Sequence, residues 1–285
     1  MWFTSDNASG AAPEVMAAVT AANAGYARSY GADPFMDRAR DQIREIFEAP
    51  EAAVYLVATG TVANALALSL LTPPWGAGFC HQHAHIAEDE SGAPEFYMHG
   101  AKLALVHGAH GRMDPAALEA AIVKAKGGGV HGVQAAAVSI TNVTEAGTVH
   151  SVAEVAALAG VARAHGLPVH LDGARFANAL VATKATPAEM TWRAGIDAVS
   201  FGGTKNGMAV GEAILFFNRA LAEDFDYRCK QAGQLASKMR FLSAPWVGLL
   251  ENDAWLKHAR HANHCAQLLS SLVADIPGVD LMFPV

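Results

Sequence analysis

Short apolar segments alternate with helical stretches through most of this chain, from Glu14 to about Phe217. The apolar segments are expected to be buried strands, and they are residues 53–58, 135–140, 169–171, 198–201 and 213–217. Apolar residues at helical spacing indicate helices between them, including residues 35–47, 62–71 and 152–165. Strands separated by helices pair in parallel, because a parallel connection needs about the length of a helix. The pattern predicts an α/β fold with a mostly parallel sheet, helices on both faces, and ligands at the carboxyl ends of the strands.

The pattern changes near the C-terminus. A long helix is predicted over residues 253–274, and residues 278–282 are expected to begin a strand. We therefore predict a large domain over residues 1–240 and the start of a small C-terminal α/β domain over residues 241–285. Because the sequence ends within the expected strand, this second domain is expected to be short or truncated.

Composition limits the partners and the cellular location. Apolar residues make up 52% of the chain and charged residues 16%, which favours a packed fold over disorder. The net charge is −7 without a basic run, so nucleic acid is not an expected partner. No apolar segment approaches the ~18 residues of a membrane span, and no signal peptide is recognised at the N-terminus. The widely spaced Cys80, Cys229 and Cys265 indicate reduced thiols, so we expect a cytoplasmic protein without a membrane partner.

Two of the expected strands lead into groups that suit one kind of cofactor chemistry. The segment 168–175 reads Pro-Val-His-Leu-Asp-Gly-Ala-Arg and delivers Asp172 and Arg175 at a strand end. The segment 200–207 reads Ser-Phe-Gly-Gly-Thr-Lys-Asn-Gly, a glycine-rich turn that carries Lys205. A carboxylate can keep a pyridine nitrogen protonated, and a lysine can form a Schiff base with an aldehyde. The pair predicts a site for pyridoxal 5'-phosphate (PLP); the alternatives are a plain Asp-Gly turn and a solvated surface lysine.

A phosphate site is expected where the strand at residues 53–58 leads into the helix at residues 62–71. Residues 59–64 read Thr-Gly-Thr-Val-Ala-Asn and lie at that junction. Backbone amides at a helix N-terminus bind phosphate, and the helix dipole contributes only ~0.3–2 kcal/mol, so cations should help. The candidate phosphate contacts are Gly60, Thr61, Thr204, Lys230 and Arg240. An ordinary strand–turn–helix connection is the alternative for this motif alone.

The histidine-rich segment 80–85, Cys-His-Gln-His-Ala-His, allows two functional interpretations. If it is extended, its three histidines share one face at a spacing compatible with zinc, although a fourth ligand is not evident. The favoured interpretation is that His85 stacks on a cofactor ring and that Glu90 handles protons. Ordinary surface histidines are the remaining alternative. No metal is therefore predicted.

These segments together resemble the low-specificity L-threonine aldolases, a group of the β-eliminating lyases among the fold-type I PLP enzymes. The matching segments span the chain in order and are Thr4-Ser-Asp-Asn7, Tyr30-Gly-Ala-Asp-Pro34, Thr59-Gly-Thr-Val-Ala-Asn64, His85-Ile-Ala-Glu-Asp-Glu90, His170-Leu-Asp-Gly-Ala-Arg175 and Phe201-Gly-Gly-Thr-Lys205. The resemblance implies a seven-stranded sheet and cleavage of L-threonine, L-allo-threonine or other β-hydroxy-α-amino acids, such as phenylserine, to glycine and an aldehyde. It also implies a homo-oligomer, a dimer of dimers with the active site at the dimer interface.

The resemblance implies a role for each main candidate. Lys205 is similar to the Schiff-base lysine, Asp172 to the partner of the pyridine nitrogen, and His85 to the stacking imidazole. Arg175 is similar to the arginine near the cofactor oxygen and the substrate carboxylate, and Ser5 to a further carboxylate contact. Lys230 and Arg240 lie in a region from which family members contact the cofactor phosphate, often across a subunit boundary.

Two departures from the family pattern concern the reaction. Many members have Asn-Thr-His where this chain has Asn142-Val-Thr144, so Thr144 or a water takes the place of a second histidine. The catalytic base is then either His85 or a water ordered by Glu90. The sequence also ends before the region where the family supplies a second carboxylate-binding arginine. The alternative functions are another PLP-dependent β-eliminating lyase, an aminotransferase, or an inactive PLP-binding homologue.

Overall fold

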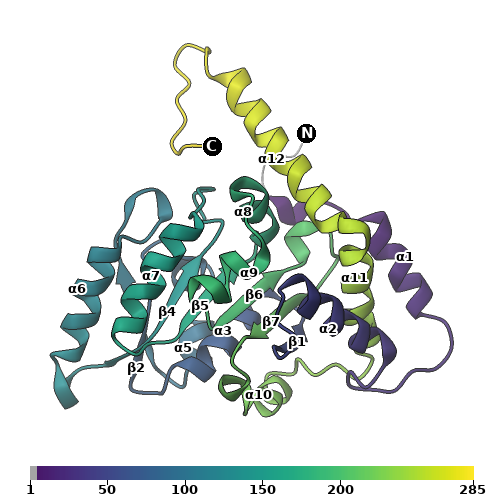
Figure 1. Ribbon diagram of the computed structural model, residues 1–285, viewed down its shortest axis with the longest axis horizontal. Coiled ribbons are helices and arrows are strands. Elements are labelled where there is room, and N and C mark those ends of the chain that lie inside the picture. Colours follow the sequence, from purple (N-terminus) through teal and green to yellow (C-terminus); the bar gives the residue numbers. More distant parts are fainter. Residues whose placement is uncertain (1–4) are drawn as a thin grey trace.

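The computed structural model describes residues 5–285, so Thr4 of the first matching segment lies outside the described residues. A seven-stranded sheet forms the centre of the molecule (Figure 1). In spatial order its strands are β1 (Ala53–Val57), β7 (Glu212–Phe216), β6 (Ala198–Gly202), β5 (Val169–Gly173), β4 (Gln134–Thr141), β2 (Gly76–His81) and β3 (Lys102–Val106). Neighbours from β3 through to β6 are parallel, whereas β7 is antiparallel to both β1 and β6. The predicted mostly parallel α/β fold is confirmed.

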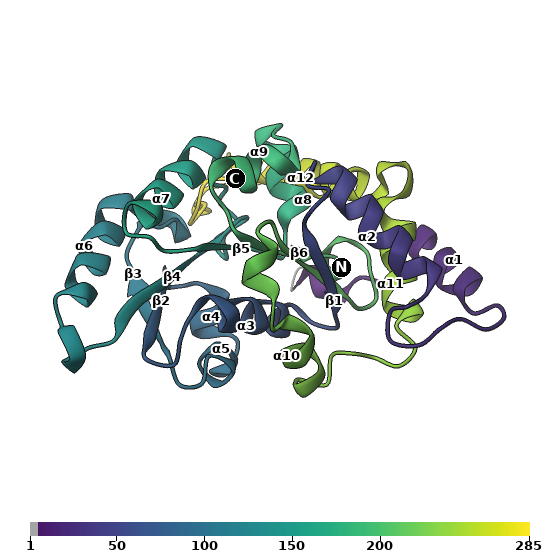
Figure 2. The same ribbon diagram turned by 60° about the horizontal axis from the view of Figure 1, so that its bottom comes forward.

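Helices cover both faces of this sheet, as the turned view in Figure 2 shows. On one side lie α3 (Gly60–Leu71), α4 (His85–Glu88), α5 (Ala93–Tyr97) and α10 (Phe225–Gln231). On the other lie α2 (Pro34–Ile46), α6 (Pro115–Lys126), α7 (Val152–Ala164), α8 (Phe176–Thr183) and α9 (Pro187–Met190). Within residues 5–285, no helix is long and apolar enough to cross a membrane.

Burial on both faces explains the apolar composition of the central strands. Every residue of β5, β6 and β7 is buried, as expected for strands with helices on both sides. Helix α3 is almost as apolar and packs across β4, β5, β6 and β7. The hydroxyl of Thr59 accepts the N–H of Val62 at 3.3 Å and caps the start of α3. Because β1 runs in the same direction as β6 and leads directly into α3, the N-terminus of α3 lies at the carboxyl ends of the parallel strands.

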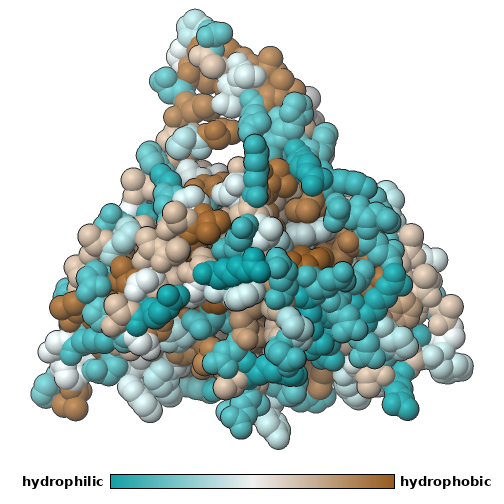
Figure 3. Space-filling model, viewed as in Figure 1, coloured by the Kyte–Doolittle hydropathy of each residue, from teal (hydrophilic) through white to brown (hydrophobic). Residues whose placement is uncertain are grey.

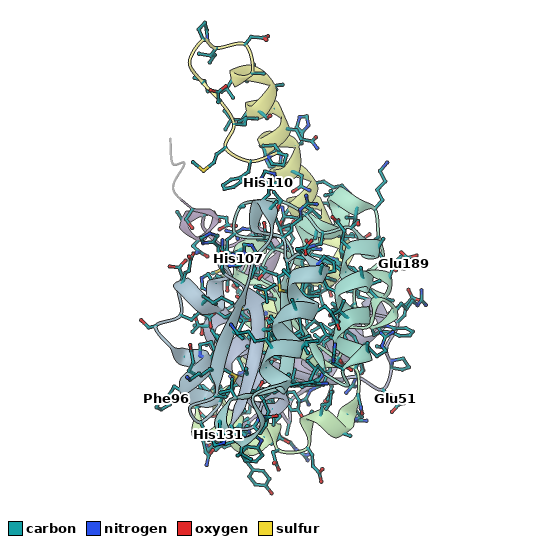
Figure 4. All side chains as sticks on the ribbon, turned by 90° about the vertical axis from the view of Figure 1, so that its left-hand side faces the viewer. Glu51, Phe96, His107, His110, His131 and Glu189 are labelled. Atoms are coloured by element: carbon teal, nitrogen blue, oxygen red, sulfur yellow. The ribbon has the colours of Figure 1, made fainter. Side chains whose placement is uncertain are left out.

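The last part of the chain forms two helices, one packed against the body of the molecule and one that is largely exposed. Helix α11 (Arg240–Leu250) packs on α1 (Pro13–Ala22) and α2, while α12 (Ala254–Val273) contacts α8 and then projects from the body of the molecule (Figure 1). Figure 3 shows hydrophobic residues gathered on this projection, and Leu268, Leu269 and Leu272 are exposed along α12. The segment after α12 turns back toward the sheet. There the ring of Phe283 lies 6.2 Å from that of His110, which Figure 4 places below the segment.

The strands and helices named from the sequence are confirmed, with ends within two residues of the predicted ones. The expected strand at residues 278–282 is wrong, because this segment forms bends without a strand partner. Strands β2 and β3 were not predicted. The first contains two glycines, and the second is a run of only five residues, most of them partly or fully exposed in the structure although four are apolar.

The crossing of α1 and α11 provides a test of the packing around the sheet. A methyl group added at Gly248 of α11 would lie 2.5 Å from the backbone oxygen of Glu14 and 2.8 Å from Cβ of Ala18. Because a backbone oxygen cannot move without its helix, we expect Gly248→Ala to lower the free energy of unfolding by roughly 1–3 kcal/mol. Urea denaturation measures this change.

Gly160 is the matched control, since it lies inside α7 and an added methyl group meets nothing within 4 Å. Gly160→Ala should therefore raise the free energy of unfolding by roughly 0.5–1 kcal/mol, through the better helix propensity of alanine. Equal effects of the two substitutions would contradict the close approach of α1 to α11.

Candidate active site

A pocket of about 390 Å³ opens at the carboxyl ends of the parallel strands. This is where open α/β sheets bind their ligands. Most of the predicted site residues line it, although they come from distant parts of the chain: Gly60, Thr61, His85, Asp172, Arg175, Thr204 and Lys205. The remaining predicted residues, considered below, do not line this pocket.

A buried hydrogen-bond network joins the imidazole of His85 to the carboxylate of Asp172. Nδ2 of Asn64, on α3, donates to Oε1 of Glu90 at 2.9 Å and to Oδ2 of Asp172 at 2.8 Å. The same Oε1 of Glu90 lies 2.9 Å from Nδ1 of His85. The Glu90 side chain has no exposed surface, so it lies behind His85 and not in the pocket itself. One amide thus bridges two buried carboxylates.

Burial and hydrogen bonding decide where protons lie in this network. Burial raises the pKa of Glu90, and the hydrogen bonds from His85 and Asn64 oppose this. The pKa of His85 is raised, chiefly by its hydrogen bond to Glu90, while partial burial of the ring lowers it. His85 is therefore protonated more readily than a solvated histidine, with a carboxylate beside it to balance the charge.

The carboxyl group of Asp172, on β5, has a hydrogen-bond donor on each of its oxygens. Its Oδ1 accepts the N–H of Ala174 at 3.0 Å, and Asn64 bonds the other oxygen. His170 is two residues earlier on the same face of β5, with its nitrogens 3.0 Å from the hydroxyls of Ser139 and Ser200. Complete burial lowers the pKa of His170 to about 4, so this ring is neutral. His170 therefore adds no positive charge beside Asp172.

Lys205 lies on the short helix η5 (Thr204–Asn206), in a turn that tolerates only glycine at its ends. Gly207 has a φ of +106°, and a methyl group at Gly203 would lie 2.5 Å from the sulfur of Met208. The N–H of Gly203 donates to Oε2 of Glu212 at 2.9 Å, which ties the turn to β7. Burial raises the pKa of the Glu212 carboxyl to about 7.

The N-terminus of α3 is open to an anion. The first amides of a helix have no partner within it, so the N–H groups of Gly60 and Thr61 are available. An added methyl group at Gly60 would meet nothing within 4 Å, which shows that a ligand can approach the backbone there. Amide donors for a phosphate, an amine from Lys205 and the carboxylate of Asp172 thus surround one cavity. These groups fit PLP.

Besides Glu90, three predicted site residues do not line this pocket within one chain. The hydroxyl of Ser5 accepts the N–H of Asn7, and it is Asn7 that lines the pocket. The amine of Lys230 lies 4.9 Å from the centre of the Tyr30 ring. Arg240 donates to a backbone carbonyl in the loop after α1.

The histidine-rich segment is not one extended strand. His81 ends β2 and His85 begins α4, so the three histidines do not share the face that the zinc interpretation assumed. Over residues 5–285, no three His, Cys, Asp or Glu side chains are arranged to hold a metal ion. Thr144, one candidate for the place of the missing histidine, is buried and bonds Thr148 at 2.8 Å.

Sequence reasoning assigned no role to four residues of the site: Asn7, Asn64, Glu145 and Glu212. Oε1 of Glu145 accepts the N–H of His85 at 2.6 Å and ties the loop after β4 to α4. Burial raises the pKa of Glu145 as well. Two of the four carried a signal: Asn64 interrupts an apolar helix, and Glu212 opens an apolar strand.

Comparison with known proteins agrees with this geometry. The β-eliminating lyase family matches residues 3–284 of the chain. A low-specificity L-threonine aldolase from Pseudomonas sp. (strain NCIMB 10558) is 56% identical over 283 residues, covering 99% of this chain and 81% of that protein. A low-specificity L-threonine aldolase from Pseudomonas aeruginosa is 52% identical with the same coverage. The threonine aldolase structure from Leishmania major matches with a TM-score of 0.93 and 30% identity, over 99% of this chain and 81% of that one.

The family assignment rests on nearly the whole chain and on the fold, not on one motif. The chain therefore belongs to the β-eliminating lyases, and among them to the low-specificity L-threonine aldolases.

Proposed function

We propose that this protein is a PLP-dependent lyase that cleaves L-threonine, L-allo-threonine or other β-hydroxy-α-amino acids to glycine and an aldehyde. The observation that carries the proposal is that Lys205, Asp172 and His85 line one pocket, in a chain whose relatives are named threonine aldolases. Another β-eliminating lyase, an aminotransferase or an inactive homologue is less favoured, because those relatives share over half of their aligned residues with this chain.

PLP supplies an electron sink for the bond that breaks at Cα of the amino acid. Lys205 would bind the cofactor aldehyde through its amine, and Asp172 would hold the proton on the pyridine nitrogen. The backbone amides of Gly60 and Thr61, together with the hydroxyl of Thr204, would bind the phosphate. His85 would stack on the ring.

The residues around the substrate would select its orientation and move its proton. Arg175 would bind the carboxylate, with Ser5 as a further contact, so that the Cα–Cβ bond is oriented for cleavage. His85 would accept the proton of the β-hydroxyl at Nε2, because Nδ1 is bonded to Glu90. Glu90 would act by holding this imidazole, since its own carboxylate does not line the pocket.

We further propose a homo-oligomer, a dimer of dimers, in which Lys230 and Arg240 reach the phosphate of a partner subunit. Neither lines the pocket of its own chain. Exposed aromatic side chains near both residues support an interface there. Tyr227 lies three residues before Lys230 on α10 and is 73% exposed, and the fully exposed Tyr26 follows Gly25, to whose carbonyl Arg240 donates.

The division of the chain is proposed from its last helices. Residues 1–240 would form the PLP-binding domain, and residues 241–285 would begin a small C-terminal domain, which the departure of α12 from the body supports. Cys80 and Cys229 are buried free thiols, which supports a cytoplasmic location.

An aldehyde-release assay tests the proposed reaction. L-threonine, L-allo-threonine and L-phenylserine are supplied with and without PLP, and glycine, aldehyde, ammonia and keto acid are measured. We expect glycine and aldehyde in equal amounts and only with PLP. Ammonia with a keto acid would indicate an eliminating lyase or an aminotransferase, and PLP binding without any product would indicate an inactive homologue.

The role of Lys205 is tested by trapping the cofactor. Borohydride reduction should attach PLP covalently to the wild-type protein and to Lys257→Ala, which removes an exposed lysine of α12 as a control. In Lys205→Ala the attached cofactor and the cleavage of threonine should both be lost, because no other lysine lines the pocket. Mass spectrometry of the reduced proteins measures the attachment. A wild-type level of attachment in Lys205→Ala would refute the assignment.

The pairing of His85 with Glu90 predicts a pH dependence. Only the neutral imidazole accepts a proton, so kcat/KM should fall as the pH drops through the pKa of His85, which lies above its ordinary 6.5. Glu90→Gln removes the carboxylate that raises this pKa, so the acidic limb of the profile should move to lower pH. His85→Phe keeps a ring to stack but should lose roughly 10²–10⁴-fold in kcat. An unmoved limb together with normal turnover of His85→Phe would exclude His85 as the base.

A further inference from the structure

Arg175, to which the proposed function gives the substrate carboxylate, is already bound by a carboxylate of the protein. Its Nε donates to Oδ2 of Asp6 at 2.6 Å, and its Nη2 donates to Oδ1 of Asp6 at 3.1 Å. Asp6 opens the short helix η1 (Asp6–Ala8) near the N-terminus. Two parallel hydrogen bonds of this kind fix a guanidinium in direction as well as in place.

Asp6 approaches Arg175 from outside the pocket. Arg175 lines the active-site pocket, whereas Asp6 does not. Asp6 instead lines two outer cavities of about 520 Å³ each, which α12 also borders. The carboxylate of Asp6 is therefore not in the place that a substrate would occupy.

The ion pair with Asp6 leaves one edge of the Arg175 guanidinium without a hydrogen-bond partner among residues 5–285. Arginine has five N–H donors in one plane, and Asp6 takes the edge formed by Nε and Nη2. Over residues 5–285, the Nη1 group has no hydrogen-bond partner, so the edge formed by Nη1 and Nη2 can donate to a second carboxylate. A guanidinium held on one edge can thus present the other edge to a ligand.

We propose that Asp6 is a positioning residue that holds Arg175 in the orientation in which it binds the carboxylate of the amino acid substrate. This proposal rests on the proposed function, which gives Arg175 that ligand. Asp6 also adds a negative charge near the incoming carboxylate, but the Asp6 side chain is 34% exposed, so water screens much of that repulsion. The gain is a long side chain that is already ordered when the ligand arrives.

The test compares two ligands that differ only in the carboxylate. Glycine and glycinamide are titrated into the PLP-loaded protein, and the absorbance change of the cofactor gives each dissociation constant. In Asp6→Asn we expect glycine to bind roughly tenfold more weakly, because misorientation of a binding group carries costs of this size or more. The dissociation constant of glycinamide should be unchanged. Asp37→Asn, an exposed aspartate in the first turn of α2, is the matched control and should change neither value.

A double variant identifies the path of the effect. In Arg175→Ala the affinity for glycine should fall, and adding Asp6→Asn to it should cause no further loss, because Asp6 acts only through Arg175. Tighter binding of glycine by Asp6→Asn would overturn the proposal and make Asp6 a competitor of the substrate. Equal weakening of glycine and glycinamide would also overturn it, as would no change in either.

The proposed function can fail separately from this inference. Threonine cleavage by the wild-type protein is measured on the same preparation. A wild-type protein that binds glycine more tightly than glycinamide but cleaves no threonine would contradict the lyase assignment, and the Asp6 comparison would still be decided by the titrations.

Discussion

The amide of Asn64 is the contact on which the rest of the site depends. Its two N–H groups bond one carboxylate that orients an imidazole, Glu90, and one that faces the pocket, Asp172. Without a donor between them, these buried carboxylates would repel each other in a medium that screens charge poorly. Asn64 is therefore the reason that two acids can lie on the same side of one cavity. Helix α3 supplies this amide together with the N-terminus that we propose binds the phosphate, so its position against the sheet determines both ends of the expected PLP site.

The fold provides this helix position through ordinary apolar packing. The parallel strands β5 and β6 are buried throughout and end at one edge, so their exposed polar groups follow the point where each strand stops. Asp172 ends β5, and Lys205 follows β6 by a turn that two glycines allow. The antiparallel β7 begins at the same edge, so its first residue, Glu212, lies beneath that turn. The pocket is thus assembled from residues that are far apart in sequence but are placed by the ends of neighbouring strands.

This division between local and distant contacts explains what the sequence could predict. Strand β5 with Asp172, and the glycine turn with Lys205, are local patterns, so their elements were recognised in advance. The bond from Asn64 to Asp172 joins residues 108 positions apart, and the pair of Asp6 with Arg175 spans 169 positions. Periodicity within a short segment cannot predict contacts between residues so far apart in the sequence. The wrong strand at residues 278–282 has the same origin, since an apolar run becomes a strand only where another strand is available to pair with it.

Four acidic side chains line the pocket or lie directly behind it, Glu90, Glu145, Asp172 and Glu212, against three basic ones, His85, Arg175 and Lys205. Glu90 and Glu212 have raised pKa values because they are buried, which favours their neutral forms. Asp172 differs from them in having a donor on each carboxylate oxygen, while the histidine beside it on β5 is neutral. The site can therefore hold several carboxyl groups without an equal number of cations. The donors on both oxygens of Asp172 hold its carboxyl group at the position where the proposed function puts the pyridine nitrogen.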